Sequence, residues 1–462
     1  MIKRIWKLLL EALRGEETLY TSGSINRAIF LLSIPMILEM LMEALFAIVD
    51  VFFVSRISVD AVATVGLTES VMTLIYSIAI GLSTAATAMV SRRVGEGQPE
   101  EAGKAAMQVI WLGAGISLVL AIVGGWFSAD ILRLMGGSPE LVAGGQGYTR
   151  VMFYGNATIM LLFLLNGIFR GAGNATLAMY SLWISNGLNI ILDPCLIFGL
   201  GPFPEMGVQG AAVATNIGRG AGVVFQLVLL LRGSGVIKLV KKHLRLYSDI
   251  MLRLLSIASG GTFQYLIASA SWIVLMRIIA PFGSDVLAGY TIAIRILIFS
   301  ILPAWGMANA AATLVGQNLG AGEPERAESS AWRTAFYNML FLLSVSVVSI
   351  IFAPQMIRFF HEGPEVVHAG VQALRIICTG YLFFAYGMVL GQAFNGAGDT
   401  FTPTLANFIC FWMIEIPLAY TLATYLGAGP TGVYIAVAVS ESLLAVLLMA
   451  LFRRGKWKTK EV

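Results

Sequence analysis

Apolar residues in this chain fall into twelve long runs, separated by short stretches rich in glycine, proline and charged residues. An apolar run of about 20 residues forms a helix that crosses the roughly 30 Å hydrocarbon core of a bilayer. The pattern therefore predicts twelve transmembrane helices. They are expected near 28–55, 61–90, 105–128, 146–168, 176–199, 208–231, 251–280, 286–316, 331–353, 370–393, 401–426 and 431–452.

The second half of the chain repeats the first. Sliding the sequence by 225 residues aligns SRRVGEGQPEEA (91–102) with GQNLGAGEPERA (316–327), and FRGAGN (169–174) with FNGAGD (394–399). Six spans per half give both halves the same orientation in the membrane, so the repeat is parallel. Parallel repeats are typical of secondary transporters, which bind substrate between the halves near the midplane. We therefore expect an all-α membrane protein with two parallel six-helix repeats around a central cavity.

Composition supports this interpretation, because 58% of the 462 residues are hydrophobic and only 12% are charged. A soluble domain carries about 25% charged residues. Most lysines and arginines fall in the two ends and in loops on one side of the membrane, which the positive-inside rule makes cytoplasmic. The expected divisions are an amphipathic cytoplasmic segment (1–26), an N-terminal six-helix bundle (27–232), a basic cytoplasmic linker (233–249), a C-terminal six-helix bundle (250–452) and a basic cytoplasmic tail (453–462).

Several kinds of chemistry find no support in the sequence. There is no GxxxxGK[ST] phosphate loop, so ATP is not expected as the energy source. The three cysteines lie within apolar runs, and His361 and His368 lack the HExxH spacing of zinc sites. The basic residues flank apolar runs, so they are topology signals and not a nucleic-acid surface. No cofactor is expected.

Asp50 and Asp193 lie well inside apolar runs. A charge at that depth costs roughly 2.5 to 3.5 kcal/mol, so an intramembrane acid indicates a functional site. Counting 1.5 Å per residue from the span ends places Asp50, Asp193 and Thr215 at one level, roughly 8 to 10 Å below the outer surface. Asn189 lies one helical turn from Asp193. Two acids in a dry pocket cannot both stay ionised, so we expect the group to hold a proton or Na⁺.

The repeat does not conserve this cluster. The 225-residue shift places Asp50, Asn189, Asp193 and Thr215 on Leu275, Ile414, Leu418 and Ser440, respectively. We therefore expect only the N-terminal half to hold the acid cluster. A purely structural role, in which the two aspartates tie helices together, is the less favoured alternative.

Pro35 interrupts the first span and removes a backbone hydrogen bond, so it is a candidate hinge. Glu39 and Glu43 share one face of the first span with Asp50 and are expected to face the cavity as well. For the further charges within the spans, a place in the cavity and an internal ion pair, such as an acid with Arg219, are equally weighted alternatives. These residues are Glu69, Arg219, Arg295, Glu415 and Glu441.

A family resemblance rests on LSIPMILEM followed by VDVFFVSRIS, on the two repeated loop motifs, on FRGAGNA with FNGAGDT, and on GLNIILDP. In combination, over about residues 25 to 455, they resemble the multidrug and toxic compound extrusion (MATE) transporters. The resemblance implies two six-helix bundles facing each other across a V-shaped cavity. It also implies efflux of amphipathic, often cationic compounds in exchange for H⁺ or Na⁺.

Within that family the chain is similar to the DinF-like branch. The branch's acid, amide, second acid, hydroxyl and proline match Asp50, Asn189, Asp193, Thr215 and Pro35. The NorM-like branch uses acids in helices 7 and 10, where this chain offers only Gln264 in the first and no acid in the second. Relatives often carry Asn and Thr where this chain has Ala47 and Val51, and this difference favours H⁺ over Na⁺.

The expected function is secondary antiport of amphipathic drugs or metabolites across the plasma (inner) membrane by a monomer, with both termini cytoplasmic. No enzymatic activity is expected. The alternative is a flippase for a lipid-linked precursor, which would line its cavity with several Arg or Lys to hold a diphosphate. Seven acids against Arg219 and Arg295 within the spans favour cations instead.

Overall fold

The computed structural model describes residues 2–15, 19–233 and 235–462, and the described part is helical throughout, without strands. The N-terminal bundle contains α2 (Ile25–Val54), α3 (Val59–Gly95), α4 (Pro99–Trp126), α5 (Ser128–Leu134), α6 (Pro139–Tyr154), α7 (Asn156–Gly171), α8 (Ala175–Phe198) and α9 (Val208–Arg232). The C-terminal bundle contains α10 (Ser248–Ile279), α11 (Ser284–Gly320), α12 (Pro324–Arg358), α13 (Pro364–Thr379), α14 (Tyr381–Gly396), α15 (Phe401–Asn407), α16 (Ile416–Tyr420) and α17 (Pro430–Arg453).

In the described part of the chain, ten helices are long and apolar enough to cross a membrane. The pair α13 and α14, bent by 58°, forms an eleventh crossing. α2 carries three acids along its 30 residues and is the twelfth. The twelve-helix fold is therefore confirmed. The predicted 1–26 segment and 233–249 linker include residues 1, 16–18 and 234, which lie outside the described residues. Within them, α1 (Ile2–Arg14) and the short 3₁₀ helix η1 (Lys241–Leu244) are helical.

The repeated loop motifs form the same turns in both halves. Gly97 and Gly322 follow α3 and α11 with φ of 72° and 75°. Gly173 and Gly398 follow α7 and α14 with φ of 89° and 84°. Only glycine adopts this left-handed conformation without strain, so these positions end the helices at matching points.

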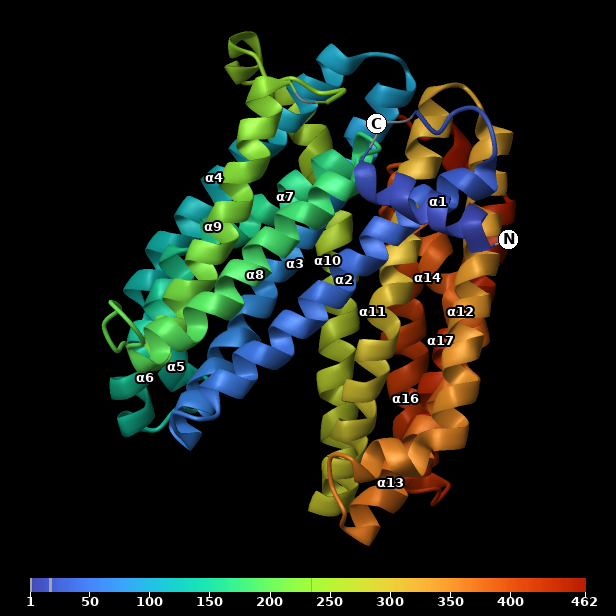
Figure 1. The fold of residues 1–462 in the computed structure, drawn as a ribbon. Helices are drawn as coiled ribbons and strands as arrows, with labels where there is room; N and C mark the ends of the chain where they lie inside the picture. The colour runs from blue at the N-terminus through green and yellow to red at the C-terminus, as the bar shows by residue number, and fades with distance from the viewer. Residues whose placement is uncertain (1, 16–18, 234) are drawn as a thin grey trace.

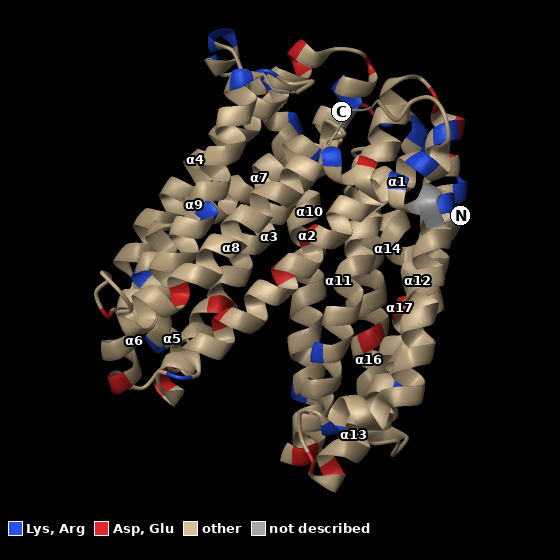
Figure 2. Cartoon of the chain, in the orientation of Figure 1, with Lys and Arg blue, Asp and Glu red and all other residues tan. Residues whose placement is uncertain are grey.

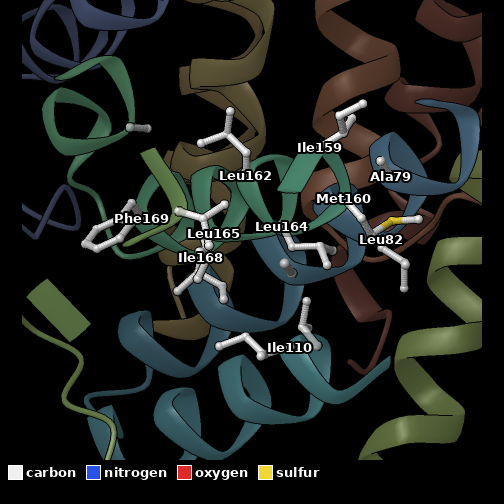
Figure 3. Packing of buried hydrophobic residues seen from close by; sticks show 14 of the residues in the cluster. Ala79, Leu82, Ile110, Ile159, Met160, Leu162, Leu164, Leu165, Ile168 and Phe169 are labelled. Carbon is white, nitrogen blue, oxygen red and sulfur yellow. The ribbon is translucent and has the colours of Figure 1, made fainter. Parts of the chain in front are cut away.

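Each bundle has its own apolar core. In the N-terminal bundle, one face of α7, including Leu164 and Ile168, packs against α3 and α4 (Figure 3). In the C-terminal bundle, a second core joins α10, α11, α13 and α17. Each bundle is thus built around its own buried contacts.

The bundles meet closely where α2 crosses α11 and where α3 crosses α10. A Cβ on Gly306 of α11 would lie 2.6 Å from the carbonyl oxygen of Met36, directly after Pro35. A Cβ on Gly81 of α3 would lie 2.4 Å from the carbonyl oxygen of Ala258. The backbones touch at these crossings, and the ribbons diverge toward the end that holds α6 and α13 (Figure 1). Both chain ends lie toward the opposite, closed end.

Candidate functional site

A cavity of about 260 Å³ lies between the bundles, lined from both halves. Aromatic and amide side chains alternate around it, with charges confined to the N-terminal half. The principal lining residues are Glu39, Glu43, Tyr76, Phe163, Asn166, Arg170, Tyr265, Trp305, Asn309, Gln392 and Asn395. A mostly apolar wall with a few directional polar groups suits an amphipathic small molecule.

Two pairs related by the repeat lie at this cavity, which is lined by Glu39, Arg170 and Asn395. In the N-terminal half, Arg170 of α7 forms an ion pair with Glu39 of α2. In the C-terminal half, Asn395 of α14 donates to Gln264 of α10 at 3.1 Å. The 225-residue shift maps Glu39 onto Gln264 and Arg170 onto Asn395. The same contact is thus charged in one half and neutral in the other.

Glu43 lies one turn further along α2 and is also paired. Its Oε1 accepts from Arg219 of α9 at 3.0 Å, and its Oε2 accepts from Asn186 of α8 at 2.9 Å. Arg219 is 2% exposed and also lies over the ring of Phe46, 5.3 Å from its centre. This contact confirms the internal ion pair that the sequence left open for Arg219.

Further along α2, the predicted coupling residues come together. Asn189 donates to Asp193 Oδ1 at 3.3 Å and to Thr215 Oγ1 at 3.2 Å, which ties α8 to α9. Asp50, half-buried on α2, interacts electrostatically with Asp193 and with Arg219. Asp193 Oδ2 and Asn189 Oδ1 are buried and have no hydrogen-bond partner in the described part of the chain. Asp193 Oδ2 is free to accept a proton, and both oxygens are free to ligate a cation.

No group of three or more acidic, cysteine or histidine side chains gathers among the described residues. A cation at the coupling site would therefore be held by two carboxylates, one amide and one hydroxyl. Glu69 of α3 interacts with Asp50, Glu43 and Arg219, so it belongs to the same electrostatic group.

The remaining candidates lie elsewhere. Pro35 is buried within an unbroken α2. Arg295 is exposed on α11 and does not line the central cavity. Glu415 and Glu441 also do not line it, because both lie within the C-terminal bundle. The expectation that these three residues face the central cavity does not match this placement.

Sequence reasoning did not single out Arg170, Asn166 or Asn186 as site residues. Asn166 donates to Glu39 at 3.1 Å and accepts from Gln226 at 2.6 Å, so it links α2, α7 and α9. Arg170 stood in the motif FRGAGN, which served only to align the repeats. Its place beside the span end is also that of an ordinary topology signal, so the sequence did not indicate its pairing with Glu39.

The MatE family model matches residues 35–195 and 262–421, one segment in each half. The chain belongs to the MatE family. It is therefore a membrane transporter and not an enzyme. The chain is 26% identical over 441 residues to the probable multidrug resistance protein NorM of Thermotoga maritima, covering 95% of this chain and 94% of that protein. It is 24% identical over 443 residues to the probable multidrug resistance protein YoeA of Bacillus subtilis, covering 95% and 96%.

A solved structure extends the comparison to the whole fold. It is described as the outward-facing conformation of a multidrug resistance MATE family transporter of the MOP superfamily. The TM-score is 0.89 at 25% identity, covering 96% of this chain and 99% of that one. This MatE chain shares that arrangement of helices.

Proposed function

We propose that this MatE transporter exports amphipathic, often cationic drugs or metabolites across the plasma membrane in exchange for H⁺, with Na⁺ as the less favoured coupling ion. The observation that carries the proposal is the central cavity beside an unpaired acid group. The cavity takes up substrate, and Asp50 with Asp193 takes up the coupling ion. The termini lie in the cytoplasm in this proposal, so the diverging ends of the bundles face outward, and the chain acts as a monomer.

The cavity chemistry supports an amphipathic substrate. Tyr76, Phe163, Tyr265 and Trp305 offer aromatic faces, which attract organic cations as well as apolar groups. Glu39 and Glu43 are each paired with an arginine, so the cavity is less negative than the acid count of the spans predicted. Selectivity for cations is therefore expected to come from the aromatic faces and from Asp50 and Asp193.

The contacts of Arg170 disfavour the lipid-linked precursor flippase. A diphosphate would need several unpaired cationic side chains in the cavity. Arg170 is the cationic residue of the principal lining, and Glu39 already neutralises it.

We further propose that proton binding to Asp50 and Asp193 bends α2 at Pro35 and releases the substrate. A cationic substrate stabilises the ionised pair and a proton neutralises it, so each ligand weakens the other's binding by the same factor. Pro35 supplies no backbone N–H to α2, and the next residue, Met36, touches Gly306 of the opposite bundle. A bend at Pro35 would therefore change the contact between the bundles.

The test is export of a cationic dye from proteoliposomes under an imposed pH gradient or Na⁺ gradient alone. The native protein should respond to the pH gradient, and Asp50→Asn and Asp193→Asn should each abolish the response. Glu365→Gln, at an exposed acid at the start of α13, is the matched control and should transport normally. Gradient-driven transport that survives both aspartate substitutions would refute the site. Lipid translocation without dye export would favour the flippase.

A further inference from the structure

The C-terminal bundle contains a helix with an unusual register. Between α15 and α16, residues Phe408–Glu415 form a π-helix, η3, and Thr421–Tyr425 form a second one, η4. A π-helix widens the turn and adds a residue relative to an α-helix, and such bulges are frequent at functional sites. The N-terminal counterpart, α8, is α-helical throughout Ala175–Phe198. Within η3 and α16, a fixed 225-residue shift therefore no longer pairs structurally equivalent positions.

The buried positions show where the register changes. In α8 the buried face includes Ser185, Asn189 and Asp193. In the C-terminal run, the buried Cys410 and Phe411 match the buried Ser185 and Asn186 at the 225-residue shift, but the buried positions that follow them are Glu415 and Ala419. These match Asn189 and Asp193 after one added residue. The structural counterpart of Asn189 is therefore Glu415, and not the Ile414 that the ungapped shift indicated.

A side-chain contact confirms the corrected alignment. Asn189 donates to Thr215 in the N-terminal bundle, and Ser440, which corresponds to Thr215, donates to Glu415 in the C-terminal bundle. Both contacts tie the fifth crossing of a bundle to its sixth. The contact is thus present in both halves in altered form, with Glu415 in the place of Asn189, a counterpart that the ungapped shift did not predict.

A second acid and three buried tyrosines complete the C-terminal group. Glu441, next to Ser440 on α17, interacts electrostatically with Glu415, and its Oε2 is buried without a hydrogen-bond partner among the described residues. The hydroxyls of Tyr290, Tyr381 and Tyr434 are also buried and unpartnered in the described part. Tyr290 is 0% exposed, lies stacked on Tyr434 and interacts with Glu415. Tyr381 interacts with Glu441.

Buried donors and acceptors without partners cost about 1 to 3 kcal/mol each. Glu415, Glu441, Tyr290 and Tyr381 are therefore gathered at a cost in stability, which indicates a functional group of side chains. The ionisable groups that interact with the acids are Tyr290 on α11, Tyr381 on α14 and Cys410 on η3, and Tyr434 on α17 is stacked on Tyr290. No lysine or arginine forms an ion pair with either acid in the described part of the chain, and Arg277, on the neighbouring α10, is exposed.

We propose that Glu415 and Glu441 form a second coupling site, which holds one proton between the two carboxyl groups. One carboxyl group is then the O–H donor and the other the acceptor, while Ser440 donates to Glu415. The site corresponds by repeat symmetry to the Asn189–Asp193–Thr215 group. The inference rests on the proposed antiport function and adds a second exchanged proton to it.

The direct test is independent of transport. Purified protein in lipid nanodiscs is titrated from alkaline to acidic buffer, and the infrared absorption of protonated carboxylic acids is recorded. The native protein should show two populations. Glu415→Gln combined with Glu441→Gln should remove one of them, and Asp50→Asn combined with Asp193→Asn should remove the other. Glu365→Gln is the matched control and should leave both unchanged.

A milder pair of variants guards against misfolding. Ser440→Ala and Tyr290→Phe keep both acids and should shift the frequency of the C-terminal band without removing it. In proteoliposomes, the glutamate double variant should exchange one proton fewer per substrate than the native protein. An unchanged carboxylic-acid spectrum in the glutamate double variant would overturn the proposal. Loss of the C-terminal band on addition of Na⁺ would also overturn it, because the site would then bind a metal cation. Loss of all gradient-driven transport in the native protein would refute the proposed function instead.

Discussion

The Glu43–Arg219 ion pair gives an asymmetric prediction about stability. Arg219 is 2% exposed at its side chain, whereas Glu43 is 27% exposed, at the wall of the cavity. Replacing one partner of a buried pair costs about 3 to 5 kcal/mol when it leaves an uncompensated buried charge. Glu43→Leu leaves Arg219 with Phe46 and the more distant attraction of Asp50, so the cost should lie near about 3 kcal/mol.

The reverse change should cost less. Arg219→Leu leaves Glu43 partly in contact with water and still hydrogen-bonded to Asn186 at 2.9 Å. The cost should be about 1 kcal/mol, as for partly solvated pairs. The double variant leaves neither member of the pair without its partner and should recover to within about 1 kcal/mol of the native protein.

Denaturant unfolding in nanodiscs, followed by tryptophan fluorescence, would measure all four members of this cycle. Two kcal/mol between the single variants corresponds to roughly a 30-fold difference in the unfolding constant, at 1.4 kcal/mol per factor of ten. The reasoning would be refuted if the two single variants lost equal free energy of unfolding and the double variant lost the sum of both. The burial of Arg219 would then not determine the cost of breaking the pair.

Three further predictions test other parts of the structure. Gly306→Ala should lower the melting temperature and slow dye export, because the new Cβ would meet the backbone of Met36. Gly115→Ala is the control, since nothing lies within 4 Å of its Cβ, and it should raise the melting temperature slightly. Melting temperatures that change in the same direction in both variants would contradict the close crossing. Glu39→Gln combined with Arg170→Asn copies the C-terminal pair and should melt closer to the native protein than either single change, as checked by calorimetry. Burial lowers the pKa of His243 below its ordinary value of 6.5. The stability that the neutral imidazole contributes is therefore present above pH 6.5 and is lost as the pH falls through the lowered pKa. On acidification, hydrogen exchange of residues 236–245 should increase in the native protein but not in His243→Phe.

Much of the fold could be predicted from the sequence because a bilayer constrains it strongly. Apolar runs of spanning length gave all twelve crossings, and the paired motifs around Gly97 and Gly322 gave the repeat. The bend between α13 and α14 gave no comparable signal, since Gly380 is one of many glycines in apolar runs.

The candidate site was predicted less completely. Asp193, Asn189 and Thr215 could be grouped because helical spacing and depth are both readable from sequence. The partners of Glu39 and Glu43 depend on which helices pack together, and the sequence does not specify that packing. The place of Glu415 was missed for a different reason, because a π-helix adds a residue without any insertion visible in the alignment of the repeats.

The pairing of the acids decides which of them can serve transport. Protonating Glu39 or Glu43 would leave Arg170 or Arg219 as a buried cation without its partner, a change that costs several kcal/mol. Asp193 has no ion-pair partner in the described part, and its Oδ2 has no hydrogen bond, so gaining a proton there breaks no contact. The acids nearest the cavity are therefore fixed as structural charges. In the proposed antiport, proton exchange would therefore use the acids set back from the cavity, where the cycle can neutralise a charge without opening an ion pair.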